Sequence, residues 1–214
     1  YPDVENKKIK IHLAIDNQMD IDKITAELNI TKVLDGEKTT LEPAYFTIPY
    51  DSVIVLEYNL GQNMDLWDEY HQPLYELNVV ISNAEKSIKD NLATTFGMRK
   101  FDDRGTQFTI NGRTTFLRGK NDACVFPLTG HPPMDKAEWA RLFNIAKSYG
   151  INHYRFHSWC PPEAAFAAAD QVGIYLQPEM PFWGGLESDT VAEMLKAKKH
   201  LTPEGLAKIL KIKA

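Results

Sequence analysis

One stretch of the chain restricts its fold more than any other. Residues 151–176 hold a short extended run, two prolines, an alanine-rich segment and a second extended run. Pro161 and Pro162 end the first run and open a helix, because proline fits a first helical turn without losing a bonded N–H. The alanine-rich segment is predicted to be helical, and Gly173 to end it. The order strand, helix, strand predicts parallel strands joined by a right-handed crossover.

Polar side chains stand at the ends of the predicted parallel strands. Arg155 and His157 end the first of these runs, Glu179 follows the second, and Asn121 and Asp122 follow an earlier β-run. In β/α barrels the chemistry takes place at the carboxyl ends of the strands, so we expect these residues to line a ligand site. Each has a structural alternative: a buried ion pair of Arg155 with Glu179, an interior histidine, and loop capping by Asn121 and Asp122.

The first part of the chain shows a period of two, as half-buried strands do. Apolar side chains alternate with polar ones in each run, and Asp35-Gly36 marks a turn between two of them. Short strands at this spacing predict a two-sheet β-sandwich over residues 1–102. The predicted strands cover residues 8–15, 21–33, 52–60, 74–82 and 92–101.

The second part, residues 103–214, changes to the period of helices. A β-run at 114–119 precedes a helix that begins at Asp135, with Glu138 completing a capping box. After the strand, helix and strand described above, further helices are predicted over 187–199 and from Thr202 onward. The whole predicts a multi-domain α and β protein, a sandwich followed by a partial (β/α)8 barrel of about three β/α units.

Five segments between residues 60 and 185 match, in order, the motifs of a known family. They resemble glycoside hydrolase family 2, which holds β-galactosidases, β-glucuronidases and β-mannosidases. The resemblance implies an immunoglobulin-like sandwich over residues 1–102 and the N-terminal part of a TIM-barrel catalytic domain over 103–214. The segments are Trp67 with residues 73–77; residues 95–100; residues 108–113; residues 116–119; and residues 150–152 with Arg155, Asp170, Gly173 and Ile174.

The resemblance implies a retaining β-glycosidase, which uses two carboxylates about 5–5.5 Å apart. In this family the acid/base Glu follows an Asn after the fourth barrel strand, and the nucleophile Glu lies on the seventh. No Asn-Glu pair follows a predicted strand here, so both catalytic residues are expected beyond Ala214 and the chain alone is expected to be inactive. Substrate contacts are then expected from Asn121, Asp122, Arg155, His157 and Glu179, with Trp183 as a sugar platform.

Two departures from the β-galactosidase pattern leave the sugar open. Residues 120–124 read Lys-Asn-Asp-Ala-Cys where such enzymes carry Asn-Arg-His, and residues 155–158 exchange His and Ser. The carbohydrate substrate is therefore not assigned to one sugar or linkage.

Composition excludes several other classes of partner. The net charge is −5 and no basic tract stands out, which argues against nucleic acid. No run of about 18 apolar residues predicts a membrane span. The two cysteines, Cys124 and Cys160, are expected to be free thiols. No zinc-type spacing and no phosphate loop occur, so no metal and no cofactor are expected.

The ends of the chain bear on its origin and compartment. Tyr1-Pro2-Asp3 lacks both an initiator Met and the pattern of a signal peptide, so a processed or excised piece is expected. Enzymes of this type that act on polysaccharide often work in the periplasm or outside the cell, which favours that location. Three strands leave sheet edges open, which predicts self-association or non-native packing of residues 186–214.

Two other functions stay open. The chain would be a non-catalytic sandwich protein that binds glycan or another chain through a truncated α/β appendage. Alternatively, it would be a small α/β enzyme in which Glu179 and His157 form a proton-transfer pair.

Overall fold

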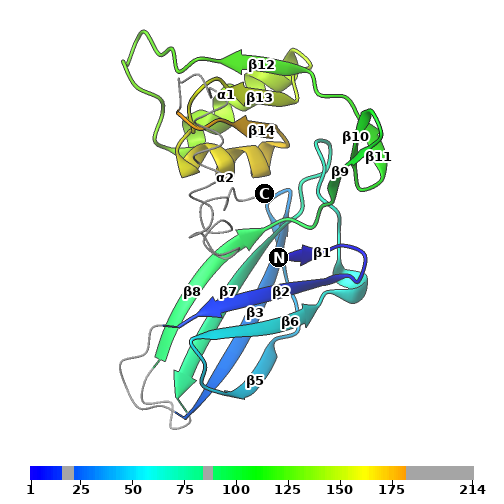
Figure 1. The fold of residues 1–214 in the computed structure, drawn as a ribbon, viewed down its shortest axis with the longest axis vertical. Helices are drawn as coiled ribbons and strands as arrows, with labels where there is room; N and C mark the ends of the chain where they lie inside the picture. Colours follow the sequence, from blue (N-terminus) through cyan, green and yellow to red (C-terminus); the bar gives the residue numbers. More distant parts are fainter. Residues whose placement is uncertain (16–21, 84–88, 182–214) are drawn as a thin grey trace, which may run out of the picture. The chain divides into compact units, whose positions relative to one another are not determined.

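The computed structural model describes residues 1–15, 22–83 and 89–181 (Figure 1). Residues 1–179 form one compact unit. Two antiparallel sheets come first along the chain. The smaller sheet has the order β1 (Pro2–Asp3), β2 (Lys8–Ala14), β6 (Val53–Asn59); the larger has the order β4 (Glu37–Thr40), β3 (Lys23–Leu34), β7 (Leu74–Asn83), β8 (Lys89–Phe96), with β5 (Ala44–Pro49) also paired to β3. A short 3-10 helix, Gly61–Asn63, follows β6.

Strict alternation builds the shared core of these two sheets. In β6, Ile54, Leu56 and Tyr58 are buried while Val53 and Val55 are more than half exposed. Fully burying one such aliphatic side chain is worth about 1.5–3 kcal/mol, so each sheet turns its apolar face to the other. The predicted alternation is thereby confirmed. The core joins Ile9, Ile11, Leu13, Ile54, Leu56 and Tyr58 of the small sheet to Ile24, Ala26, Leu28, Ile30, Tyr75, Leu77 and Val79 of the large one.

The predicted turn at Asp35-Gly36 is also confirmed. Both residues have positive φ, 51° and 86°, and Leu34 pairs directly with Glu37. A two-residue hairpin loop of type I′ needs this left-handed backbone at both positions. The hairpin returns the chain as β4, a fully exposed strand without the apolar alternation that would have predicted it.

The strand predicted over residues 92–101 is wrong at its C-terminal end. β8 ends at Phe96, and a separate strand, β9 (Phe101–Arg104), begins after a break. In the break Gly97 lies against Trp67, where an added Cβ would be 3.5 Å from the Trp67 Cβ. Met98 forms an isolated bridge with Leu66. The chain leaves the sheet here because it packs on the indole.

A small antiparallel sheet of order β11-β10-β9 connects the two parts of the chain. It contains β10 (Gln107–Ile110) and β11 (Arg113–Thr115). The predicted β-run over 114–119 is therefore wrong as a single strand. Asn152 explains the break: its side chain accepts from the Arg118 N–H at 2.7 Å and donates to the Phe116 carbonyl at 3.0 Å. These bonds replace strand pairing for the connecting residues.

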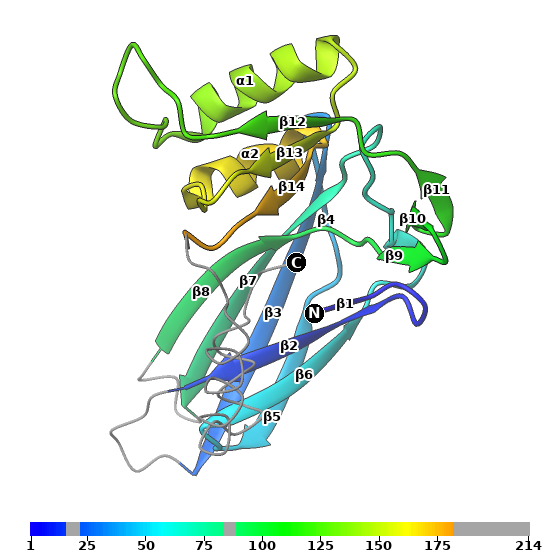
Figure 2. The same cartoon turned by 45° about the horizontal axis from the view of Figure 1, so that its top comes forward.

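Three parallel strands follow, in the order β12 (Gly119–Asp122), β13 (His153–Phe156), β14 (Tyr175–Pro178). α1 (Lys136–Ser148) and α2 (Glu163–Val172) lie between them in sequence (Figure 2). The predicted strand, helix, strand is confirmed. A second core joins the helices to the sheet through Trp139, Phe143, Ala146, Tyr154, Phe156, Ala165, Ala168, Ala169, Val172 and Ile174.

The ends of the helices follow the sequence signals closely. Asp135 caps α1 by accepting from the Glu138 N–H at 2.8 Å, although the Glu138 carboxylate binds Arg141 instead of completing the capping box. Gly173 ends α2 with a φ of 81°. A Cβ there would lie 2.8 Å from the Glu69 carbonyl oxygen, so the backbone requires glycine for both conformation and space.

Trp67 joins the first part of the chain to the parallel sheet. Its indole N–H donates to the Asp170 carbonyl at 2.7 Å, and the Arg99 guanidinium lies 4.8 Å from its ring centroid. Arg99 also pairs with the Asp170 carboxylate at 3.4 Å. These contacts belong to one compact unit that includes both hydrophobic cores, and the domain boundary at residue 102 stays a prediction. The helices predicted over 187–199 and from Thr202 lie outside the described residues.

Candidate functional site

The register of the parallel sheet decides which side chains share a face. Asn121 pairs with Arg155, and Arg155 pairs with Gln177. Tyr154 and Phe156 pack into the core against the helices. Because side chains alternate along a strand, Asn121, Arg155 and Gln177 project from the opposite face.

An ion pair with an amide neighbour spans the three strand ends. Arg155 Nε donates to Glu179 Oε1 at 2.7 Å, and its Nη1 donates to Asn121 Oδ1 at 3.0 Å. The second Glu179 oxygen accepts from the Ser158 backbone N–H at 2.8 Å. Both charged side chains keep contact with solvent, 41% exposed for Arg155 and 25% for Glu179. We call Asn121, Arg155 and Glu179 the strand-end cluster.

The strand-end cluster holds Glu179 as a carboxylate. The Ser158 N–H lowers the pKa of Glu179 most, burial opposes it, and the Arg155 guanidinium lowers the pKa further through its hydrogen bond and charge. A hydrogen bond to the charged form favours that form. At neutral pH Glu179 is therefore an ionised acceptor, already occupied by protein donors.

Two donors of the strand-end cluster remain for a ligand. Within residues 1–15, 22–83 and 89–181, neither Nη2 of Arg155 nor the amide nitrogen of Asn121 has a hydrogen-bond partner. Each is fixed by the bond that its neighbouring atom makes. The geometry therefore presents oriented N–H groups that suit hydroxyl or carboxylate oxygens.

Asp122 lies elsewhere. It is the last residue of β12, not a residue after the strand, because the strand begins five residues later than predicted, at Gly119. Its carboxylate accepts from the Cys124 N–H at 3.0 Å and pairs with Lys120 at 3.0 Å. The bond from Cys124 is a loop-capping contact of the kind that the sequence offered as the alternative, and a ligand contact by Asp122 stays a prediction.

His157 follows β13 and is half-buried. Its backbone N–H donates to the Asp122 carbonyl at 2.8 Å. Its electrostatic interaction with Glu179 also lowers the pKa of that carboxyl, by less than the contacts of Ser158 and Arg155 do. Trp183, the predicted sugar platform, lies outside the described residues.

Sequence reasoning missed the backbone conformation at the strand ends. Cys124 and Ser158 have left-handed φ values of 58° and 59°, one shortly after β12 and the other shortly after β13. Neither is a residue type that favours this region, and such backbone costs about 1–3 kcal/mol unless its surroundings hold it. No sequence signal marks Ser158 as left-handed.

Trp159 links the same strand ends. Its indole N–H donates to the Asp122 carbonyl at 3.0 Å, and its own carbonyl accepts from the Glu179 N–H at 3.1 Å. Its ring packs edge-on to Phe156 with centroids 5.0 Å apart. These contacts are those of a half-buried core residue.

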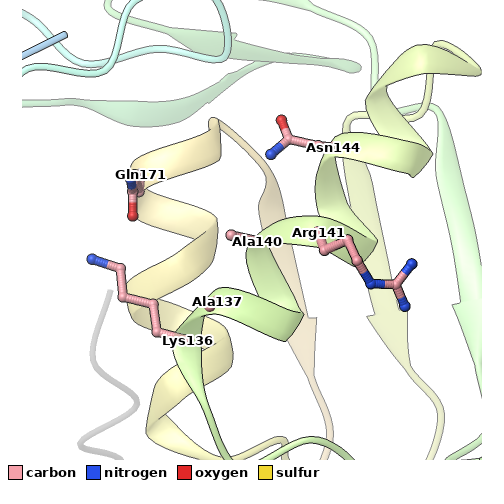
Figure 3. A pocket seen from close by; sticks show the side chains of 6 residues that line it. All are labelled: Lys136, Ala137, Ala140, Arg141, Asn144 and Gln171. Atoms are coloured by element: carbon pink, nitrogen blue, oxygen red, sulfur yellow. The ribbon is translucent and has the colours of Figure 1, made fainter. Parts of the chain in front are cut away.

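A groove of about 550 Å³ is lined by residues of α1 and by Gln171 of α2 (Figure 3). Its floor consists of Ala137 and Ala140 of α1, which face α2 in the figure. None of the predicted site residues lines it. The lining residues are Lys136, Ala137, Ala140, Arg141, Asn144 and Gln171.

The described residues offer no group of three or more His, Cys, Asp or Glu side chains arranged to hold a metal ion. Cys124 and Cys160 are both free and exposed, and burial raises the pKa of the Cys124 thiol. Among the helices in the described part of the chain, neither has the length and apolar character needed to cross a bilayer.

Comparison with known sequences gives one family. A family model described as Glycosyl hydrolases family 2 matches residues 1–99. A putative β-glucuronidase of Formosa agariphila is 27% identical over 161 residues, which is 74% of this chain and 19% of the relative. A β-galactosidase of Thermoanaerobacterium thermosulfurigenes is 26% identical over 206 residues, 89% of this chain and 28% of the relative. The chain thus spans 19% of the length of the first of these proteins and 28% of the second.

Solved structures share the fold. The β-glucuronidase of Parabacteroides merdae superposes with a TM-score of 0.66 at 21% identity, covering 94% of this chain and 25% of that one. A glycosyl hydrolase family 2 member from Bacteroides cellulosilyticus gives a TM-score of 0.67 at 19% identity, covering 91% and 26%. At this identity the superpositions establish the likeness of fold.

Proposed function

Because the chain belongs to glycoside hydrolase family 2, we propose that it is part of a retaining β-glycosidase that hydrolyses O-glycosidic bonds in carbohydrates. The observation that carries the proposal is the strand-end cluster. Arg155, Glu179 and Asn121 come from three successive parallel strands and meet at their carboxyl ends. That edge is where barrel enzymes bind their substrates.

The architecture proposed for this enzyme has two domains. Residues 1–102 form an immunoglobulin-like sandwich, supported by the core that two antiparallel sheets share. Residues 103–214 belong to a TIM barrel, supported by three parallel strands with helical crossovers. A closed barrel of this type has eight strands, so the remaining strands come from sequence other than the three strands described here.

The two catalytic carboxylates are proposed to lie on those remaining strands, beyond Ala214. Glu179 is unsuited to the general acid role because that role needs a raised pKa, whereas Ser158 and Arg155 lower the pKa of Glu179. Both of its oxygens already accept protein hydrogen bonds. Its lowered pKa likewise disfavours the alternative in which Glu179 and His157 exchange a proton.

The strand-end cluster then binds and orients the sugar. Nη2 of Arg155 and the amide of Asn121 are fixed donors that suit sugar hydroxyls, and Glu179 holds the guanidinium in place. His157, Asp122 and Trp183 remain proposed contacts of the sugar. We also propose that the protein works in the periplasm or outside the cell. A further part of the proposal is self-association through the open edges of β12 and β14. The sheet order supports self-association, since each outer strand has a partner on one side only among the described residues.

A hydrolysis assay tests the proposal. The protein encoded by the complete reading frame and the 214-residue chain are each incubated with a panel of nitrophenyl β-glycosides. Release of nitrophenol by the complete protein alone is expected. A complete protein that hydrolyses none of them would support the alternative, a non-catalytic sandwich protein that binds glycan or another chain.

A further inference from the structure

We propose that Ser158 and Trp159 are positioning residues, which hold the Glu179 carboxylate and, through it, the Arg155 guanidinium in the orientation that binds the sugar. The inference rests on the glycosidase function proposed above. Neither residue touches the sugar in this account. Each acts on the strand-end cluster through backbone or side-chain contacts.

Ser158 acts through its backbone. Its N–H donates to Glu179 Oε2 at 2.8 Å while Arg155 donates to Glu179 Oε1 at 2.7 Å, so both carboxylate oxygens are fixed. The donor points at the carboxylate because Ser158 has a φ of 59° and the chain turns sharply after β13. A residue kept out of the left-handed region would carry this N–H elsewhere.

Trp159 holds the turn in place from the other side. It contacts the ends of all three parallel strands. Its indole N–H donates to the Asp122 carbonyl of β12 at 3.0 Å, and its ring centroid lies 5.0 Å from that of Phe156 in β13. Its backbone carbonyl accepts from the N–H of Glu179, which follows β14, at 3.1 Å. Phe126, from the segment after β12, packs edge-on against the same indole at 6.3 Å. The indole thus packs between Phe126 and Phe156. Because Ser158 directly precedes Trp159 in the chain, these contacts also hold the backbone of Ser158 in place.

Ser158 and Trp159 together connect the turn after β13 to the strand-end cluster. Glu179 is tied at its main chain by Trp159 and at its side chain by Ser158. Arg155 is tied by Glu179 and Asn121. A functional side chain is held accurately only when its supporting contacts fix it, and a misplacement of about 1 Å can cost about 100-fold in rate.

The first test uses the 214-residue chain and needs no activity. A ¹³C NMR titration measures the pKa of the Glu179 carboxyl in the wild type, Ser158→Val, Ser158→Gly and Trp159→Phe. Valine resists the left-handed region, so the Glu179 pKa should rise, and it should rise less in Trp159→Phe. Glycine keeps both the N–H and the conformation, so the pKa should stay low. Arg155 and His157 also act on this carboxylate and are unchanged in every variant.

Asp35→Val is the matched control. Asp35 has a similar φ of 51° but lies in the turn between β3 and β4. The Asp35→Val variant should therefore be at least as stable as Ser158→Val, and the Glu179 pKa should be unchanged in it. An unchanged pKa in folded Ser158→Val and in Trp159→Phe would overturn the proposal. If Ser158→Val does not fold, Trp159→Phe, which keeps an aromatic ring, decides alone.

The second test is a double-mutant cycle in the complete protein. Ser158→Val and Glu179→Gln should each lower kcat/KM for a nitrophenyl β-glycoside, by about 10- to 100-fold. The double variant should be no slower than Glu179→Gln, because Ser158 acts through that carboxylate. Effects that multiply would mean a merely structural role and contradict the proposal. A wild type that hydrolyses no glycoside would refute the proposed function, and the titration would still decide whether Ser158 and Trp159 position Glu179.

Discussion

The indole N–H of Trp67 donates a hydrogen bond of 2.7 Å to the backbone carbonyl of Asp170, which lies 103 residues further along the chain. Trp67, Gly97, Arg99 and Asp170 all belong to segments that resemble glycoside hydrolase family 2, and all four meet here. The residues that carry the resemblance therefore make the contacts between the segments that follow β6 and β8 and the helix α2 of the parallel sheet. The strand-end cluster is a separate place, and only Arg155 belongs to both sets.

Trp67→Phe should destabilise the chain by about 2–3 kcal/mol. The substitution removes the donor to the partly buried Asp170 carbonyl and leaves a cavity beside Tyr175. Urea unfolding followed by circular dichroism measures the change. Tyr45→Phe, at a side chain 65% exposed, is the matched aromatic control and should change nothing. Equal stability of Trp67→Phe and wild type would mean that the junction contributes little.

Glu69→Gln should lower stability at pH 7 by about 1–3 kcal/mol. Burial raises the pKa of Glu69, but hydrogen bonds from Tyr175, its own backbone and Arg113 outweigh it and the pKa is lowered. The carboxylate therefore contributes stability that is present above the ordinary carboxyl pKa of about 4.3 and is lost as the pH falls through the folded pKa. Urea unfolding at several pH values should show wild type and variant converging in acid. Curves that stay parallel would refute this role.

Gly119→Ala should destabilise the chain, by about 1–3 kcal/mol. Gly119 pairs with His153 across β12 and β13, and a Cβ would lie 2.7 Å from the His153 Nδ1. His153→Ala in the same chain should recover most of the loss. Gly97→Ala, where the added Cβ would meet Trp67 at an ordinary 3.5 Å, is the control. A loss that His153→Ala does not recover would place the cause in the backbone.

His153 should also make stability depend on pH. Burial lowers its pKa, so the folded chain keeps the imidazole neutral while the unfolded chain binds a proton below its ordinary pKa of about 6.5. Stability is then lost as the pH falls from about 6.5 toward the folded pKa. In His153→Gln the melting temperature should depend less on pH between pH 7 and 5.5 than it does in the wild type. An unchanged pH dependence in His153→Gln would contradict the assignment.

Arg155→Lys should lower kcat/KM of the complete protein by about 10- to 100-fold. A lysine has one ammonium group and cannot bond Glu179 and Asn121 with a planar fork. Arg141→Lys is the matched control because Arg141 pairs with Glu138 on the exposed surface of α1. Initial rates with a nitrophenyl β-glycoside measure both. Equal loss in the two variants would assign the effect to stability.

The sequence predicts a feature well where burial repeats with a regular period. Ile9, Ile11 and Leu13 alternate as β2 requires, and Asp135 and Gly173 mark helix ends by side-chain and backbone chemistry. β4 and β9 are fully exposed and carry no apolar alternation, so nothing local predicts them. The run at 114–119 breaks because Asn152, far along the chain, supplies the hydrogen bonds for residues 116–118.

The site follows the same division. Strand ends predict that Arg155 and Glu179 lie close together, and parallel register brings Asn121 to them. Asp122 falls on the other face because it is the next residue after Asn121 in β12, and one position along a strand reverses the face. Ser158 has a left-handed backbone in the turn after β13. Its contacts with Glu179 and the neighbouring Trp159 favour this conformation, and its residue type does not, so the sequence does not predict it.

The stereochemistry of hydrolysis by the complete protein tests the central claim most directly. A ¹H NMR spectrum taken in the first moments of hydrolysis of a nitrophenyl β-glycoside identifies the anomer released. A retaining enzyme of glycoside hydrolase family 2 releases the β-anomer first, and the α-anomer appears only later by mutarotation. Release of the α-anomer first, or no hydrolysis of any β-glycoside, would contradict the account.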